Sequence, residues 1–396
     1  MLRQVEGSKA VADAVAACAP EVICAYPISP QTHIVEGLGR LVKDGSLPNC
    51  EFINVESEFA AMSVAIGASA TGARTYTATA SQGLLYMVEA VYNASGLGLP
   101  IVMTVANRAI GGPINIWNDH SDSMSQRDSG WLQLYAENNQ EAADLHIQAF
   151  RIAEEMSMPV MVCMDGFILT HAYEQVDIPS REEVAAFLPT FIPRQYLDPA
   201  EPISIGAMVG PESFMEVKFL AHQRMIDSID KVAEVAHDFE KQFGRKTGGL
   251  LRTYRTEGAE TIVLALGSVI GTLKDVIDEM QLDGSPIGLV GLTSFRPFPY
   301  EAVANALKDA KRVVILEKAF STGTGGIVTQ DVARAIEGQG VKDFTLIAGL
   351  GGRPITIAAL RGYLEAAMVE QVKRLTFLDL EEDLIDSELM KERALR

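Results

Sequence analysis

A chain of 396 residues exceeds the roughly 250 to 300 residues that one hydrophobic core usually serves, so two domains are expected. With 48% hydrophobic and 21% charged residues, the composition excludes disordered and fibrous proteins. The formal net charge of -19 at pH 7 disfavours nucleic acid and anionic lipid as partners, because like charges repel.

The first half of the chain alternates short apolar runs with helical patterns, which is typical of a parallel sheet covered by helices. Small and apolar residues recur at helical spacing from Ala60 to Ala68 and from Leu84 to Val91. This α/β domain is expected to cover residues 1–185. Its strands are predicted at residues 22–26, 51–55, 74–79, 101–106 and 160–164.

A proline-rich stretch from Ile178 onward predicts irregular structure, which opens a connecting segment over residues 186–249. An amphipathic helix follows within that segment, and Gly244 is expected to end it. Its apolar stripe contains Val217, Leu220, Ile226, Ile229, Val232, Ala236, Phe239 and Phe243. A second, smaller α/β domain is expected over residues 250–396, with strands at 261–266, 287–290, 312–316 and 344–348.

The cysteines and the N-terminal residues indicate in which cellular compartment the protein is found. Cys18, Cys24, Cys50 and Cys163 lie far apart, so they form no ligand run for zinc or an iron–sulfur cluster, and no metal site is predicted on this chain. Two of them sit among apolar neighbours, where a free thiol behaves as a small hydrophobe, and this indicates a reducing compartment. The N-terminus lacks the apolar core of a secretion signal, and no stretch approaches the ~18 uninterrupted apolar residues of a membrane span. A cytoplasmic location is expected.

Polar loops follow the first two predicted strands. The strand at 22–26 runs into Tyr26-Pro27-Ile28-Ser29-Pro30-Gln31-Thr32, at the sheet edge where ligands of such folds bind. Alternatively, Ser29 caps the next helix, with Pro30 at its first position. The strand at 51–55 leads into Glu56-Ser57-Glu58, where two carboxylates at a helix start, taken alone, are best explained as simple capping groups.

The next two strand ends are also polar. Ser81, Gln82 and Gly83 follow the strand at 74–79, and such small polar residues let a ligand approach the backbone closely, although no nucleotide-phosphate motif is present. The strand at 101–106 leads into Asn107 and Arg108, whose planar guanidinium suits a substrate carboxylate. The loop that follows contains Gly111, Asp119, His120 and Asp122. The alternatives are a buried ion pair for Arg108 and a loop-stabilising network for Asp119, His120 and Asp122.

Each of these loops alone has a structural explanation. Four independent structural explanations do not account for polar loops at four consecutive strand ends. Because the carboxyl ends of parallel strands meet at one edge of a sheet, Ser29, Glu58, Ser81, Gln82 and Arg108 are predicted to line one wall of a pocket.

In this order, the motifs resemble the α subunits of the 2-oxoacid:ferredoxin oxidoreductases, and among them the pyruvate enzymes. The similarity extends over nearly the whole chain, through Asn139-Gln140-Glu141-Ala142 to Phe295-Arg296-Pro297-Phe298-Pro299. It implies an α/β fold in which a parallel-sheet domain that binds the pyrimidine of thiamine diphosphate precedes a domain like the C-terminal domain of transketolase.

The resemblance also implies residue roles. Glu58 matches the glutamate that bonds the pyrimidine ring nitrogen and so activates the thiazolium C2, with Pro27, Ile28, Ser81 and Gln82 as further cofactor contacts. Arg108 and Ser29 match positions that hold the substrate carboxylate. The remaining implied substrate contacts are Asn107, Gly111, Asp119 and His120.

Two departures from the family pattern concern the substrate. Ser29 stands where the family usually has threonine, and Ile110-Gly111-Gly112 replaces a bulkier Leu-Ser-Ala. The first change keeps the hydroxyl but drops a methyl group, which slightly loosens the pocket. The second leaves room for an aryl or branched 2-oxoacid such as phenylglyoxylate or 2-oxoisovalerate.

Two absences concern the partners. The Gly-Asp-Gly…Asn motif that holds Mg²⁺ and pyrophosphate in thiamine enzymes is missing, and Asp165-Gly166 resembles it only in part. The resemblance therefore implies a β subunit that carries the pyrophosphate and Mg²⁺, and cluster-bearing subunits with [4Fe-4S] centres.

The expected function is that of an α subunit in an enzyme that oxidatively decarboxylates a 2-oxoacid, with pyruvate as the default, using coenzyme A and passing electrons to ferredoxin. One alternative is half of a transketolase or of a lipoamide-type decarboxylase, which would share the glutamate and the domain order. Another is a non-catalytic scaffold, against which the presence of Ser29, Glu58 and Arg108 together argues.

Overall fold

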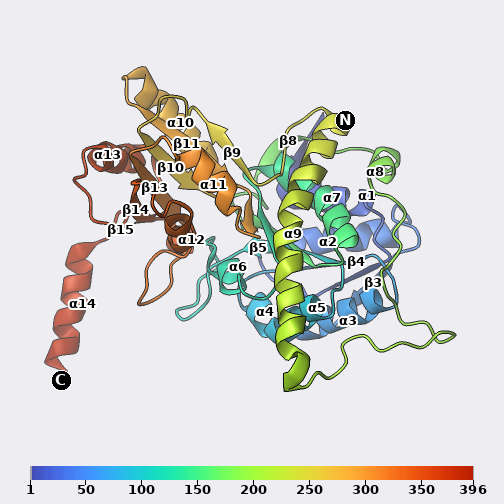
Figure 1. Ribbon diagram of the computed structural model, residues 1–396. Helices are drawn as coiled ribbons and strands as arrows, with labels where there is room; N and C mark the ends of the chain where they lie inside the picture. The colour runs from blue at the N-terminus through green and yellow to red at the C-terminus, as the bar shows by residue number, and fades with distance from the viewer. Residues whose placement is uncertain (1, 396) are drawn as a thin grey trace.

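The computed structural model describes residues 2–395. Figure 1 shows two α/β bodies side by side, with one long helix crossing the face of the first. Within the described residues, no helix combines the length and the apolar character that a membrane crossing requires.

The first sheet has seven strands in the order β12-β6-β7-β5-β4-β2-β3, and all neighbours are parallel except β12 and β6. The five strands predicted for this domain are confirmed to within one residue at each end. The sequence does not predict β6, a four-residue run that contains the buried amide Gln133. The bounds are β2 (Val22–Ala25), β3 (Glu51–Asn54), β4 (Thr75–Thr79), β5 (Ile101–Asn107), β6 (Leu132–Tyr135), β7 (Val160–Asp165) and β12 (Ser294–Arg296).

Helices cover both faces of this sheet. On one face α1 (Gly7–Ala17), α2 (Thr32–Lys43) and α7 (Asn139–Met156) share a hydrophobic core with the sheet. On the other face α3 (Glu58–Ala70), α4 (Ser81–Tyr86) and α5 (Val88–Gly96) do the same, with α6 (Ser121–Ser125) nearby. The helical pattern from Leu84 to Val91 is thus split in two at Met87. A small antiparallel pair, β1 (Leu2–Glu6) with β8 (Tyr173–Asp177), lies outside the main sheet.

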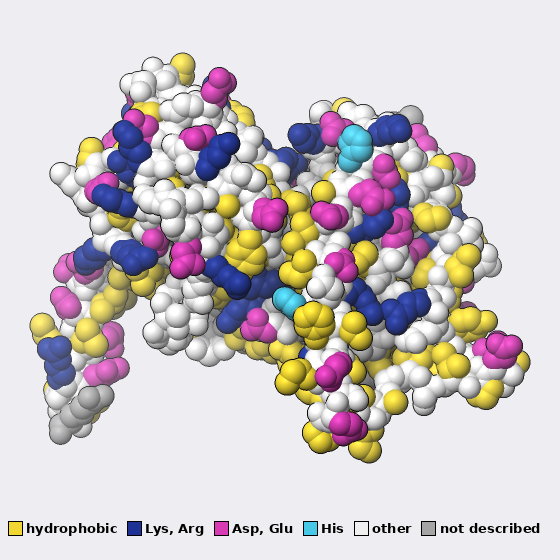
Figure 2. Space-filling model, in the orientation of Figure 1, with side chains coloured by type: hydrophobic (Ala, Val, Ile, Leu, Met, Phe, Trp, Pro, Cys, Tyr) yellow, Lys and Arg dark blue, Asp and Glu magenta, His cyan; other side chains and the backbone are white. Residues whose placement is uncertain are grey.

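The proline-rich stretch from Ile178 is more regular than predicted at its start, because α8 (Arg181–Phe187) forms behind a capping box of Ser180 and Glu183. The amphipathic helix α9 (Pro211–Phe243) ends at Gly244 as predicted, and Gly244 adopts a left-handed conformation there. Only its second half packs on α7, through Val232, Val235 and Phe239. The first half is exposed, and Figure 2 shows hydrophobic side chains gathered at its lower end.

The second sheet has six strands in the order β15-β14-β13-β10-β11-β9, parallel throughout except that β9 runs antiparallel to β11. Its four predicted strands are confirmed to within two residues, whereas the short edge strands β9 and β15 are not predicted. The strands are β9 (Leu251–Tyr254), β10 (Thr261–Ala265), β11 (Ile287–Leu292), β13 (Arg312–Glu317), β14 (Lys342–Ile347) and β15 (Leu375–Phe377). The helices are α10 (Val269–Leu282), α11 (Tyr300–Leu307), α12 (Val328–Ala335), α13 (Ile357–Met368) and α14 (Glu382–Ala394), and α14 projects from the body in Figure 1.

The two bodies share a strand. Although β12 belongs to the second half of the chain, it pairs with β6 of the first sheet, with Ser294 opposite Leu134. The buried ring of Phe295 meets Tyr135 edge-on at a centroid distance of 6.2 Å. The first sheet is therefore completed by residues that follow the second domain's own β11.

Candidate active site

The predicted wall lies along one edge of the first sheet. In the strand order β5-β4-β2-β3, Arg108 follows β5, Ser81 follows β4, Ser29 lies beyond β2 and Glu58 begins the helix after β3. Because these strands are parallel neighbours, their carboxyl ends meet there, as the sequence predicts.

Glu58 is buried, with 8% of its surface exposed. It does not cap α3, because the Ser57 hydroxyl does so by accepting a hydrogen bond of 3.2 Å from the Ala60 N–H. Within residues 2–395, the Glu58 carboxylate has neither a hydrogen bond nor an ion pair. A buried carboxylate in that state is costly unless another molecule satisfies it.

Gly83 makes room for this carboxylate. A Cβ at Gly83 would stand 2.7 Å from Glu58 Oε1 and 2.6 Å from Thr79 Oγ1, so only glycine permits the approach of α4 to α3. Thr79 Oγ1 is buried without a hydrogen-bond partner in the described chain. Two unsatisfied oxygens, on Glu58 and Thr79, therefore face the same small space beside a glycine.

Arg108 and Ser29 are in direct contact. The Arg108 guanidinium donates from Nη1 to the Ser29 carbonyl at 3.0 Å and from Nε to the Asn115 carbonyl at 3.1 Å. No carboxylate of residues 2–395 lies within ion-pair distance of it, so the interpretation of Arg108 as half of a buried ion pair is wrong. Burial lowers the pKa of Arg108, against the opposing charge of Asp122. An unpaired, partly buried cation of this kind favours an anionic ligand.

Ser29 does not cap a helix, so that alternative is also wrong. Helix α2 begins at Thr32 behind Gln31, and no side chain caps it. Gln31 instead anchors the turn, donating from Nε2 to the Ala78 carbonyl at 2.7 Å and accepting from the Ile28 N–H at 3.3 Å. The Ser29 side chain is exposed and available to a ligand. The anchoring role of Gln31 is not predictable from the sequence, because a buried glutamine in a turn carries no local signal.

Asp122 joins two of the strand ends. Its Oδ2 accepts from the backbone N–H groups of Ser81 and Arg108, each at 2.9 Å, and its Oδ1 accepts from Asn107 at 2.8 Å and from the Ser123 N–H at 2.7 Å. Burial raises the pKa of Asp122 to about 6, even though all four hydrogen bonds act to lower it. The loop-stabilising interpretation of Asp122 is confirmed.

The other predicted cofactor contacts are placed as follows. Ser81 donates to the Ala109 carbonyl at 2.5 Å and also bonds the Gln82 side chain. Gln82 lies over Gly111, where a Cβ would come within 1.9 Å of Gln82 Nε2. Pro27 is exposed, and Ile28 is half-buried on the same turn as Ser29.

The structure does not bring three of the predicted substrate contacts to this wall. Asn107 is fully buried behind Arg108 and bonds Asp122 and Ser123. Asp119 accepts from the N–H groups of Ser121 and of Gly351 in the second domain, at 2.9 and 3.1 Å. His120 Nε2 lies 2.5 Å from Asp165 Oδ1. For Asp119 and His120, the network interpretation holds, because Asp119 Oδ1 bonds Ser121 of its own loop, Asp119 Oδ2 bonds Gly351 across the domain interface, and His120 Nε2 bonds Asp165.

Asp165 is the centre of that interface. It forms an ion pair with the buried Lys318 at 2.9 Å and accepts from the Ser268 N–H at 3.1 Å, both residues of the second domain. Although burial acts to raise the pKa of Asp165, the charges of Lys318 and His120 hold it well below its usual range. The Asp165-Gly166 pair is therefore engaged in domain packing, and its carboxylate is not free for a metal ion.

Comparisons with known proteins identify the class. A family model for the thiamine-diphosphate-binding domain of pyruvate flavodoxin/ferredoxin oxidoreductase matches residues 13–237, and one for core domain II of pyruvate:ferredoxin oxidoreductase matches residues 259–360. The 2-oxoglutarate:ferredoxin oxidoreductase of Magnetococcus marinus superposes with a TM-score of 0.69 at 18% identity, over 92% of this chain and 65% of that one. A split-gene transketolase superposes with a TM-score of 0.55 at 13% identity, over 93% and 100%. The fold is that of a thiamine-diphosphate-binding α/β protein.

Curated relatives narrow the class to one family. The pyruvate synthase subunit PorA of Methanosarcina barkeri is 46% identical over 96% of this chain and 97% of its own length. PorA of Methanocaldococcus jannaschii is 47% identical over 90% and 92%. The ketoisovalerate oxidoreductase subunit VorA of Pyrococcus horikoshii is 38% identical over 91% and 92%. The chain belongs to the pyruvate:ferredoxin oxidoreductase family, and it is a subunit of a thiamine-diphosphate-dependent 2-oxoacid oxidoreductase.

The residues present fit thiamine diphosphate. Its aminopyrimidine offers ring nitrogens and an amino group, which complement the unpartnered Glu58 carboxylate and Thr79 hydroxyl. The missing Cβ at Gly83 lets these two oxygens lie close to the start of α4. Glu58 and Thr79 are therefore suited to hold the pyrimidine end.

Proposed function

We propose that this chain is the α subunit of an enzyme that oxidatively decarboxylates pyruvate with coenzyme A, giving acetyl-CoA and CO2 and reducing ferredoxin. The observation that carries the proposal is that two ionic groups without an ionic partner lie along the same edge of the sheet. One is the buried carboxylate of Glu58, and the other is the guanidinium of Arg108. Relatives at 42–47% identity that are pyruvate synthase subunits favour pyruvate as the substrate.

The proposed roles follow from the chemistry of each group. Thiamine diphosphate, when bound, supplies the nucleophilic carbon and the electron sink that decarboxylation requires. Glu58 would bond a pyrimidine ring nitrogen and set its protonation, while Arg108 would neutralise the substrate carboxylate by charge. The Ser29 hydroxyl, beside Arg108, would donate to the same carboxylate. Pro27, Ile28, Ser81 and Gln82 would shape the cofactor pocket, and Gly111 would lie beside the substrate.

We propose that the remaining chemistry lies on partners. A β subunit would hold the pyrophosphate and Mg²⁺, since Asp165 is committed to Lys318, and cluster-bearing subunits would carry the [4Fe-4S] centres. The four cysteines support this assignment, because each is buried as a free thiol in its own part of the fold. Free thiols also fit a reducing cytoplasmic location. For the chain itself we propose a first domain over residues 1–185, a connecting segment over 186–249 and a second domain over 250–396. Strand β12 lies in the second range but pairs with the sheet of the first domain.

A branched 2-oxoacid is the second candidate substrate. The glycines at 111 and 112 leave the pocket short of side chains at that point, and a relative named ketoisovalerate oxidoreductase is 38% identical. Pyruvate is preferred because the pyruvate synthase subunits are the more similar relatives.

The test uses the native complex, assayed anaerobically with coenzyme A and a low-potential electron acceptor. Pyruvate is compared with 2-oxoisovalerate and phenylglyoxylate, and the highest kcat/KM is expected for pyruvate. Turnover of none of the three would contradict the proposed function, and preference for 2-oxoisovalerate would replace the substrate.

The matched variants are Glu58→Gln and Glu56→Gln, because Glu56 lies two residues away, is exposed, and forms no hydrogen bond or ion pair within residues 2–395. Glu58→Gln is expected to lower kcat at least ~100-fold and to slow deuterium exchange at C2 of bound thiamine diphosphate, since the pyrimidine loses its proton partner. Glu56→Gln should leave both rates unchanged. Equal exchange rates in the two variants would contradict the role of Glu58.

A further inference from the structure

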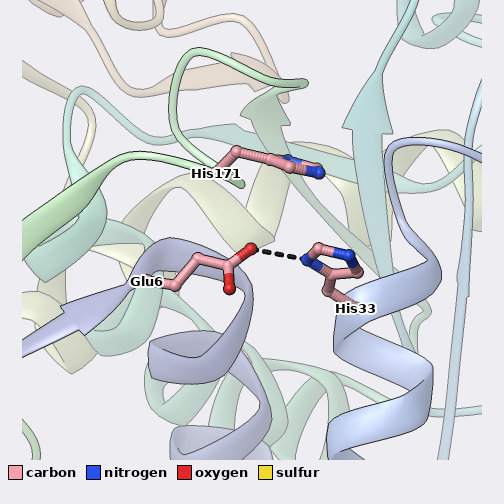
Figure 3. Close-up of side chains that lie close together, drawn as sticks. All are labelled: Glu6, His33 and His171. Atoms are coloured by element: carbon pink, nitrogen blue, oxygen red, sulfur yellow. Dashed lines mark hydrogen bonds and ion pairs between the residues drawn. The ribbon is translucent and has the colours of Figure 1, made fainter.

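Three side chains outside the candidate active site converge at the molecular surface. Figure 3 shows Glu6 and His33 directed toward one another, with the His171 ring lying above them. Glu6 Oε1 is 2.6 Å from His33 Nδ1, and the two imidazole rings have a centroid distance of 4.7 Å. One ligand atom from each residue can be chosen so that all three lie within 4.8 Å of one another.

We propose that Glu6, His33 and His171 form a binding site for a divalent transition-metal ion of the Zn²⁺ type. Two imidazoles and one carboxylate are a common three-ligand set for zinc, which then takes a water molecule as its fourth ligand. Atoms that each lie about 2 Å from one ion are at most about 4 Å apart. Side-chain shifts of about an ångström would therefore bring the three ligand atoms to bonding distance from one ion.

The backbone holds two of the three ligands in place. Glu6 ends β1 and precedes α1, yet its side chain caps no backbone N–H and stays available. The Gly7 N–H donates to the Ala172 carbonyl at 3.0 Å and the Ser8 N–H to the Thr170 carbonyl at 2.9 Å, which fixes His171 opposite Glu6. A Cβ at Gly7 would come within 2.1 Å of the Leu169 carbonyl, so this approach depends on glycine.

A second hydrogen bond orients one imidazole. The Thr170 hydroxyl lies 2.7 Å from His171 Nδ1 and also accepts from the Phe167 N–H at 2.8 Å. A hydroxyl has two lone pairs, so it can accept from Nδ1–H as well, which leaves Nε2 of His171 free to bind the ion. Histidine ligands of metals usually have such a partner on their other nitrogen.

The surroundings favour a cation and provide a way in. A surface hollow of about 450 Å³ borders Glu6 and His33, and four carboxylates and two cations line it. Lys9 and Asp13 offset each other in an ion pair of 3.0 Å, and the three remaining carboxylates outnumber the one remaining cation, so the hollow has a net negative character. The lining charged residues are Glu6, Asp13, Glu36, Asp44, Lys9 and Arg40.

The experiment titrates ZnCl2 into the full-length chain, first stripped of metal with a chelator, and follows binding by calorimetry. The wild-type chain is expected to bind one equivalent at this site. His33→Gln and His171→Gln should each weaken that binding roughly 100-fold, and Thr170→Val about tenfold through the lost orientation of the ring. The matched control is His222→Gln, because His222 is an exposed histidine on α9 that belongs to no group of three potential metal ligands in the described chain.

Folding is checked separately, by comparing the thermal unfolding midpoints of all variants without metal. His33 has 49% of its side chain exposed, so His33→Gln is expected to leave the midpoint unchanged. The proposal is overturned if the wild-type chain binds no zinc. It is equally overturned if His33→Gln and His171→Gln, with unchanged midpoints, bind zinc as the wild type does.

Discussion

Asp122 determines how two polar turns are placed relative to each other. One of its oxygens accepts from the backbone of both Ser81 and Arg108, residues 27 positions apart that follow neighbouring strands. It touches no proposed ligand, so its effect on substrate binding acts through the position of Arg108. Hydrogen bonds to a charged acceptor contribute about 1.5–3 kcal/mol each, which is enough to fix both turns.

Replacing this carboxylate by an amide should therefore weaken substrate binding. Asp122→Asn keeps the shape but loses the charge, and a tenfold or greater rise in KM for the 2-oxoacid is expected, since tenfold corresponds to about 1.4 kcal/mol. The matched control is Asp128→Asn, whose side chain is 71% exposed. Steady-state kinetics of the complex provide the measurement, and equal KM values in the two variants would contradict the assignment.

The same carboxylate predicts a pH dependence of stability. Its pKa of about 6 in the folded state exceeds the unfolded value of 3.8, so the folded chain binds this proton more tightly. The stability that it contributes is fully present below about pH 3.8 and is lost as the pH rises through about 6, at most ~3 kcal/mol. Urea denaturation of wild type and Asp122→Asn at both ends of this range should show the difference between them changing with pH.

At the residue scale, the sequence predicts which strand ends carry polar groups but not which atoms meet. Ser29, Glu58, Ser81 and Arg108 could be grouped because the end of a parallel strand has a known place in the fold. The inward direction of Asn107 and the anchoring bonds of Gln31 depend on partners 15 and 47 residues away. Local patterns do not encode such pairings.

Among the elements, α9 departs most from its prediction. The apolar stripe forms a helix as predicted, but only its second half packs on α7, and Leu220 in the first half remains 61% exposed. The periodicity of the apolar residues predicts which face of a helix is to be buried. It does not predict how much of that face another element will cover, which for α9 depends on where α7 lies. The same limit explains why the edge strands β9 and β15 and the short β6 are not predicted.

Replacing phenylalanine by alanine in the two halves of α9 should change the free energy of unfolding of the isolated chain by very different amounts. Phe239→Ala removes a ring that is fully buried beside Phe187 and Phe243, and a loss of about 3–5 kcal/mol in the free energy of unfolding is expected. Phe219→Ala removes a ring that is 60% exposed on the same helix, so its change should stay within about 0.5 kcal/mol. Chemical denaturation measures both, and similar losses would show that the first half is packed in solution.

At the scale of the whole molecule, the two bodies are joined by a buried ionic contact. Lys318 of the second domain reaches Asp165 at the end of β7, and each side chain is at most 3% exposed. His120 and Ser268 complete the contact. A buried charge that loses its partner is strongly destabilising, so both bodies depend on this pair.

Lys318→Met tests that dependence, since it removes the lysine ammonium from the buried Asp165 and leaves only His120 beside it as a cationic partner. The expected loss is about 3–5 kcal/mol in the free energy of unfolding. Lys311→Met is the matched control, because Lys311 pairs with Glu260 at the surface and should contribute at most about 1 kcal/mol. Denaturation curves that agree for the two variants would contradict the importance of the buried pair.

The placement of β12 has a consequence for how the chain can be divided. A polypeptide that stops after residue 249 lacks this strand, so the backbone of β6 would be left as a bare sheet edge with Tyr135 uncovered by Phe295. Unpaired edges of this kind recruit other chains and promote aggregation. On the ribosome, likewise, the first sheet stays incomplete until residue 296 has emerged, so the cofactor-binding half must wait for the other half before its sheet closes.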